Sequence, residues 1–88
     1  MKREQNTLTN YRSGKTMKVL IKAKDIKKRL IRKNKSQNWL AYRLEVSSGY
    51  MSQLMDGSRS PSPKLRERIM NQFPENGFDD LFVIKGRE

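Results

Sequence analysis

Residues 36–57, SQNWLAYRLEVSSGYMSQLMDG, predict two short helices with almost no connection between them. Ser36 is a favourable N-cap for a helix that ends at Leu44, and Ser47 can cap a second helix after a turn at 45–46. Gly57 can end this second helix in a left-handed conformation. The residues expected to face the core are Leu40, Ala41 and Leu44 in the first helix, and Met51, Leu54 and Met55 in the second. The stretch thus predicts a helix–turn–helix at residues 37–55, a motif that projects its second helix from the surface.

The outward side of that second helix carries small or uncharged side chains. These are Ser48, Gly49, Tyr50, Ser52 and Gln53. Serine and glutamine can donate and accept hydrogen bonds at base edges, and a glutamine amide can bond N6 and N7 of adenine together. A solvated polar face of an ordinary helical bundle is the alternative interpretation. The tight turn and the charge of the chain favour base reading in the major groove of DNA.

Outside this stretch the chain predicts further short helices and two strand-like runs. A helix over about 24–33 would bury Ile26, Leu30 and Ile31, and Pro63 would open another over 63–73. The apolar positions of this later helix are Leu65, Ile69, Met70 and Phe73. A helical turn starts near Phe78, and the runs 18–22 and 81–85 could pair into a small two-stranded sheet. We therefore expect an all-α bundle of four to five helices over residues 17–85, preceded by a flexible basic arm at 1–16.

The positive charge is confined to the first part of the chain. The 88 residues hold 20 Lys and Arg against 9 Asp and Glu, a formal net charge of +11. Residues 1–35 contain 13 of the basic and 2 of the acidic residues, whereas residues 36–88 contain seven of each. A polyanionic partner is the interpretation we favour over a solubilising tail. The expected phosphate contacts from the chain's basic residues are Lys27, Lys28, Arg32, Lys35 and Arg43.

Several classes of function are disfavoured by composition. Cysteine and histidine are absent, so disulfides, thiolate metal sites and imidazole catalysis are excluded. No metal, cofactor or enzymatic activity is expected, and Asp79 and Asp80 are more simply partners of a helix dipole than catalytic acids. The apolar runs are too short to span a membrane and the N-terminus lacks a secretory signal, which suggests a cytoplasmic protein.

The helical pair resembles the helix–turn–helix of the Cro and phage-repressor type, the Xre family. The elements that carry the resemblance are Ser36-Gln37, Leu40-Ala41, Val46-Ser47, Met51-Ser52-Gln53-Leu54, Gly57 and Pro61. The resemblance implies a lambda-repressor-like bundle that binds operator DNA, usually as a dimer on a two-fold site. By position, Gln37 would bond a phosphate, and Ser58, Arg59 and Ser60 would touch the DNA backbone. Repressors of this type can wrap an N-terminal arm around the duplex, with Arg3, Arg12 and Lys15 as the candidate contacts. A tail that adds only non-specific attraction is an equal alternative.

Three positions depart from the family pattern. The turn position where the family prefers glycine is Glu45, so a residue with a side chain is expected to be left-handed there. Leu30 and Met55 stand where the family often has an Arg–Glu pair. Trp39 occupies a position that is usually charged, and a lid over the edge of the core is favoured over an interaction patch.

The sequence as a whole predicts a sequence-specific, double-stranded-DNA-binding transcriptional regulator. The setting that the resemblance implies is a phage, a prophage or another mobile element, in the bacterial cytoplasm or nucleoid. Two alternatives remain open at this point. One is a protein-interaction adaptor or antirepressor that uses the helix–turn–helix surface, and the other is an RNA-binding module that depends on the basic first third.

Overall fold

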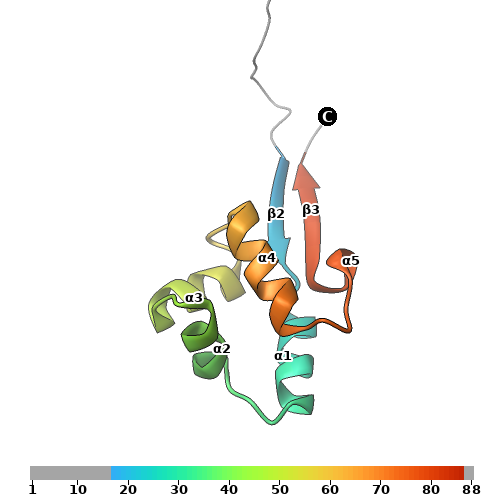
Figure 1. Ribbon diagram of the computed structural model, residues 1–88. Coiled ribbons are helices and arrows are strands. Elements are labelled where there is room, and N and C mark those ends of the chain that lie inside the picture. The colour runs from blue at the N-terminus through green and yellow to red at the C-terminus, as the bar shows by residue number, and fades with distance from the viewer. Residues whose placement is uncertain (1–16, 87–88) are drawn as a thin grey trace, which may run out of the picture.

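The computed structural model describes residues 17–86, and in this range the chain forms five helices and one two-stranded sheet. The elements are β2 (Met17–Ile21), α1 (Ala23–Arg32), α2 (Gln37–Leu44), α3 (Ser48–Asp56), α4 (Pro63–Gln72), α5 (Phe78–Leu81) and β3 (Phe82–Gly86). Figure 1 shows the helices gathered together while the β2–β3 ribbon projects beyond them. The prediction of a compact, mostly helical fold with a sheet formed by the two terminal runs is confirmed, and the element boundaries differ from prediction by about one residue.

Serine side chains begin three consecutive helices. Ser36, Ser47 and Ser62 have extended backbones, and the hydroxyl of each accepts a hydrogen bond from the backbone N–H three residues later. The donor–acceptor distances are 3.0, 3.0 and 3.2 Å, respectively. Each cap satisfies an N–H that has no partner within its own helix, which fixes where the helix starts. The caps predicted at Ser36 and Ser47 are therefore confirmed.

One cluster of apolar side chains from the helices and the base of the ribbon forms the core. Its buried members are Ile21, Ile26, Leu30, Leu40, Ala41, Leu44, Met51, Leu54, Leu65, Ile69, Phe73, Leu81 and Phe82. Met55 and Met70, which were predicted to be inward, are half-buried and pack against the edge of this cluster. The helical spacing thus identified the core positions of α2, α3 and α4.

The prediction that Ile31 faces the core is wrong. Its side chain is 72% exposed, whereas its neighbour Leu30 is buried. Helical residues turn by about 100° each, so Ile31 lies roughly 140° around α1 from the buried Ile26, and Leu30 only about 40°. Ile26 and Leu30 therefore define the inward stripe, and Ile31 falls outside it.

The two strands pair antiparallel from Met17 opposite Gly86 to Ile21 opposite Phe82. An isolated two-stranded ribbon is only marginally stable in water, so contacts with the core have to support it. That support lies at its base, where Ile21 and Phe82 are both buried in the core cluster. The exposed tip of the ribbon carries Met17 and Ile84, each more than half exposed.

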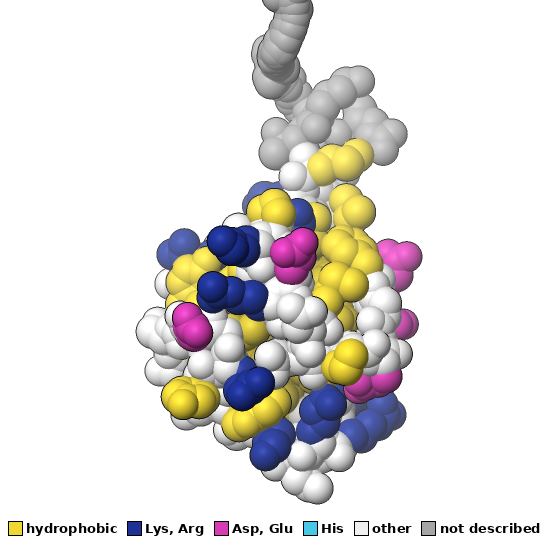
Figure 2. Space-filling view, viewed as in Figure 1, with side chains coloured by type: hydrophobic (Ala, Val, Ile, Leu, Met, Phe, Trp, Pro, Cys, Tyr) yellow, Lys and Arg dark blue, Asp and Glu magenta, His cyan; other side chains and the backbone are white. Residues whose placement is uncertain are grey.

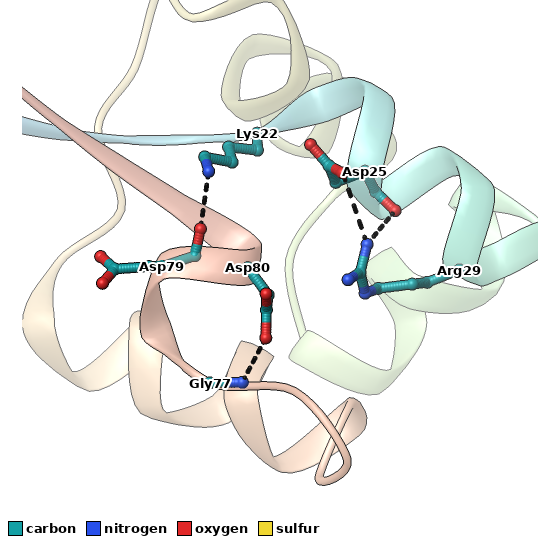
Figure 3. Close-up of polar contacts among 6 residues, drawn as sticks. All are labelled: Lys22, Asp25, Arg29, Gly77, Asp79 and Asp80. Atoms are coloured by element: carbon teal, nitrogen blue, oxygen red, sulfur yellow. Dashed lines mark hydrogen bonds and ion pairs between the residues drawn. The ribbon is translucent and has the colours of Figure 1, made fainter.

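Polar contacts at the base of the ribbon join β2 and α1 to α5 (Figure 3). The Lys22 ammonium donates to the carbonyl oxygen of Asp79 at 2.7 Å, and the Lys22 N–H donates to Leu81 O at 2.8 Å. Asp80 accepts a hydrogen bond from the Gly77 N–H at 2.9 Å, at the start of α5. The Asp80 carboxylate thus caps the α5 N-terminus, where a negative charge is favourable, whereas Asp79 contributes its backbone carbonyl to the contact with Lys22.

The joint between α2 and α3 depends on a left-handed residue. Glu45 has φ 61° and ψ 41°, so the left-handed backbone predicted at this turn position is confirmed. Arg68 of α4 donates from Nη1 to Leu44 O at 3.2 Å and lies 3.9 Å from the Glu45 carboxylate. The guanidinium therefore satisfies a carbonyl at the C-terminus of α2 and pairs with the residue that carries the strained backbone.

Replacing Glu45 with Gly should stabilise the protein by about 0.5–1 kcal/mol. A left-handed backbone costs a residue with a Cβ roughly 1–2 kcal/mol, and the exposed ion pair with Arg68 contributes less than about 1 kcal/mol. Urea unfolding measures the change. Glu45→Gln is the control, since it removes the charge and keeps the backbone strain, and it should lower stability slightly. Equal stability of the Gly and Gln variants would show that the backbone is not strained.

Candidate nucleic-acid interface

The outward face of α3 is polar and open to solvent. Met51 and Leu54 are fully buried and place the opposite side of the helix at the surface. Ser48, Gly49, Ser52 and Gln53 are exposed, as the helical period predicted. The prediction for Tyr50 needs correction, because its side chain is half-buried and packs against the edge of the core. It lies about 100° around the helix from Met51, on the flank that faces α4.

Gly49 lies near the middle of this face and no neighbouring group requires it to be glycine. A Cβ added there would have Ser47 Oγ, at 4.0 Å, as its nearest neighbour. The backbone is helical, so no positive φ demands glycine either. A glycine inside a helix is destabilising by roughly 0.5–1 kcal/mol relative to alanine. The residue is thus unfavourable for the stability of α3, but it removes bulk from the outward face.

A shallow hollow lies on the flank of α3 that faces α1 and α2. Its volume is about 320 Å³ and it is lined by Lys27, Gln37, Ser52, Met55 and Asp56. The Gln37 amide nitrogen lies 3.5 Å from Ser52 Oγ, so the first residue of α2 reaches the outward face of α3. An ammonium group beside the N-terminus of α2 favours an anion at this place.

The hollow also contains a carboxylate that remains ionised. The hydroxyl and the backbone N–H of Ser58 hold the pKa of Asp56 below its ordinary value of 3.8, and the N–H lies 2.8 Å from Asp56 Oδ1. Because the folded-state pKa is lowered, this contact stabilises the fold above the unfolded-state pKa and is lost as the pH falls. At neutral pH an anion is therefore favoured at the Lys27 side of the hollow and opposed at the Asp56 side.

The loop after α3 brings Arg59 back over the helix. Its Nε donates to Gln53 Oε1 at 2.8 Å, and its guanidinium carbon lies 4.7 Å from the centre of the Tyr50 ring. Ser58, Arg59 and Ser60 are all exposed, in agreement with the surface position that the resemblance implies. Sequence reasoning missed the contacts among Arg59, Gln53 and Tyr50. The i, i+3 spacing of Tyr50 and Gln53 was the available signal, because it places both on one side of α3.

The remaining basic residues expected at phosphates do not all lie beside α3. Arg32 lines a different hollow with Arg29, Lys33 and Glu75, about 140° around α1 from Lys27. Arg43 donates from Nε to Gln72 Oε1 of α4 at 3.2 Å. The structure thus brings Lys27 and Gln37 next to the α3 face, and places Arg32 and Arg43 on other flanks of the molecule.

Lys28 and Lys35 are exposed on and after α1, where Figure 2 shows Lys and Arg side chains gathered at one end of the molecule. The Lys35 ammonium lies 5.3 Å from the centre of the Trp39 ring. Trp39 is half-buried against the core, which agrees with the lid interpretation. Arg3, Arg12 and Lys15 of the expected arm lie outside the described residues.

Comparisons of the chain with protein-family models, with curated proteins and with solved structures find no match. Between residues 17 and 86 no helix is long and apolar enough to cross a bilayer. The same part of the chain has no group of three acidic side chains that could hold a metal ion.

Gly49→Ala should raise the free energy of unfolding by about 0.5–1 kcal/mol, because the added methyl meets open space on a helical backbone. Gly57→Ala is the matched control. Gly57 also has room for a Cβ, but its φ of 85° is left-handed, so alanine should be destabilising there. Chemical denaturation of both variants checks the pair. A loss of stability in the Gly49 variant would contradict the open environment described for this site.

Proposed function

We propose that the protein is a sequence-specific, double-stranded-DNA-binding transcriptional regulator of the Cro and phage-repressor type, in which α2 and α3 act as the helix–turn–helix. The observation that carries the proposal is the outward face of α3, where Ser48, Gly49, Ser52 and Gln53 are exposed and uncharged. At its middle, Gly49 is a glycine that packing within the chain does not require. Such a face suits the approach of another surface to the helix backbone.

The dimensions and chemistry of the major groove match this face. The groove of B-DNA is about 12 Å wide and admits one helix, whose N-terminal residues then meet base edges. The hydroxyls of Ser48 and Ser52 can donate to or accept from bases, and Gly49 allows the backbone to come close. Lys27 and Gln37 line the same hollow on the flank of α3, and both would contact one phosphate group of the bound duplex.

The distribution of charge suggests that one part of the chain attracts the duplex and another part recognises its sequence. Residues 17–35 hold nine Lys and Arg and one Asp, whereas the first eight residues of α3 are uncharged. Lysine and arginine around α1 would attract the duplex without reading its sequence, since phosphate contacts carry no direct sequence information. Discrimination would then come from α3 and the loop that follows it.

The setting we propose is that of a phage, prophage or mobile-element regulator in the bacterial cytoplasm or nucleoid. The default mode of action is repression by occupying an operator and excluding RNA polymerase. A homodimer on a two-fold operator would place two α3 helices one turn of DNA apart, about 34–36 Å.

A protein-interaction adaptor is the second candidate, and one observation favours it. Tyr42, a large side chain on α2, is 78% exposed and belongs to neither the core nor the α3 face. Exposed aromatic residues are enriched at protein interfaces. An RNA-binding role would depend on the same basic residues as DNA attraction.

Selection of bound duplexes from a random pool tests the proposal. A DNA-binding regulator should enrich one sequence, and competition with structured RNA should not displace the selected duplex. A palindromic consensus would indicate a dimer, and a single half-site a monomer. Binding without any sequence preference would contradict the proposed function and favour the adaptor or the RNA-binding module.

Lys27→Gln should weaken binding to the selected duplex almost equally for all sequences and reduce the salt slope of log K by about 1. Arg32→Gln is the matched control, since it removes one positive charge from the opposite flank of α1. The control should change the slope less than Lys27→Gln does. Equal slopes for the two variants would place the phosphate contact elsewhere.

Gly49→Ala should weaken binding to the selected duplex although the same change stabilises the free protein. The methyl group would stand between the helix backbone and the bases. Fluorescence anisotropy with the selected duplex measures the loss, and Asn71→Ala on the exposed side of α4 serves as a control that should leave affinity unchanged. Affinity equal to the wild type would contradict a close approach at this position.

A further inference from the structure

Arg59 is held over α3 by contacts that fix the plane of its guanidinium group. Its backbone N–H donates to Gln53 O at 3.3 Å, and its Nε donates to the Gln53 side-chain oxygen at 2.8 Å. Its guanidinium carbon lies 4.7 Å from the centre of the Tyr50 ring, within the range of a cation–π contact. The Ser58 hydroxyl also approaches Gln53 O, at 3.4 Å, which ties the loop to the end of the helix.

These contacts leave the terminal fork of the guanidinium available. Arginine has five N–H donors, and the single donor on Nε is the one bonded to Gln53. Between residues 17 and 86 the two terminal amino groups of Arg59 have no hydrogen-bond partner. Arg59 is exposed, so its terminal fork faces solvent beside the outward face of α3.

Accepting the proposed function, we propose that Arg59 is a specificity-determining residue that selects a guanine in the major groove, with Tyr50 and Gln53 as positioning residues. The two terminal amino groups form a planar fork that matches the O6 and N7 acceptors of guanine, the commonest specific contact of arginine with DNA. This role differs from the backbone contact that the resemblance implies for Arg59.

The position of Arg59 favours a base over a phosphate. The side chain lies across Tyr50 and Gln53, which form one side of α3 beside Gly49, rather than extending away from the helix. A flexible arginine loses rotamer freedom when it binds, whereas this one is already ordered by its neighbours. A planar fork held beside the outward face of α3 is placed where base edges would lie if this helix entered the major groove, and guanine is the base whose O6 and N7 match the fork.

The same geometry gives Gln53 a different role from direct adenine recognition. A glutamine that reads adenine uses its oxygen and its nitrogen together. In this protein the Gln53 oxygen accepts from Arg59, so the orientation of the amide follows the arginine. The side chains of Gln53 and Arg59 are coupled to each other by this bond, and under the proposal both would act on the same base pair.

Arg59→Lys distinguishes recognition of a guanine from contact with the DNA backbone, because lysine keeps the positive charge but lacks the planar fork. The full-length wild type and this variant are each used to select duplexes from a random pool. Affinities are then measured for the wild-type consensus, for its three substitutions at the guanine, and for a duplex with 7-deazaguanine, which lacks N7. Arg66→Lys on α4 is the control for an arginine outside the α3 face. Thermal unfolding verifies that each variant is folded.

The wild type should prefer guanine at one position by about 10- to 100-fold. Arg59→Lys should lose most of this preference with an unchanged salt slope. The 7-deazaguanine substitution should weaken binding by the wild type and should have little effect on Arg59→Lys. Gln53→Ala and Tyr50→Leu should lower the preference at the same base pair, whereas Tyr50→Phe, which keeps the ring, should retain it. Arg66→Lys should select the wild-type consensus.

Two results overturn the inference. If Arg59→Lys selects the same consensus as the wild type, or weakens all duplexes equally, Arg59 contacts the DNA backbone and the proposed function stands. If the wild type selects no consensus at all, both the inference and the proposed function are overturned. The 7-deazaguanine measurement uses the wild-type protein, so it gives a result even if a variant is unstable.

Discussion

The placement of α3 depends on the left-handed backbone at Glu45, because this residue turns the chain from the end of α2 into the cap of α3. Arg68 of α4 holds the turn from outside by bonding Leu44 O and pairing with the Glu45 carboxylate. The core fixes the same geometry from inside, since Leu44 and Met51 on either side of the turn are both fully buried. The polar face of α3 points outward because the contacts of Arg68 and the burial of Leu44 and Met51 favour the same orientation of the helix.

Much of this arrangement could be predicted from local sequence signals. Serine caps and helical spacing located α2 and α3, and Pro63 with the helical spacing after it located α4. The left-handed backbone at Glu45 was expected from the resemblance to the Cro and phage-repressor motif, which prefers glycine at this position. Ile31 was assigned wrongly because an apolar residue next to a buried one was counted as part of the same stripe. The contacts of Arg68 and the packing of Tyr50 could not be predicted from the sequence. They depend on how α4 packs against α2 and α3, and no local sequence pattern determines that packing.

The candidate interface was predicted as a list of residues, and the structure divides that list. Lys27 and Gln37 border the α3 face, while Arg32 and Arg43 lie on other flanks. Charge along the sequence indicates how many cations a segment holds, but the helical period decides which side each one occupies. An excess of charge spread around α1 suits an attraction that does not depend on orientation, and a pair of groups beside α3 suits a fixed docking geometry.

The β2–β3 ribbon has a practical consequence for handling the protein. Met17 and Gly86 are paired across the strands at the tip, so the two ends of the described chain leave side by side, beyond the helices (Figure 1). A reporter or affinity tag joined directly to Met17 or Gly86 would start from this tip rather than over α3. In a chain limited to residues 17–86, the neighbouring ends are also what circular permutation requires, and a short linker across the tip would allow new ends to be opened in an exposed loop such as that between α4 and α5.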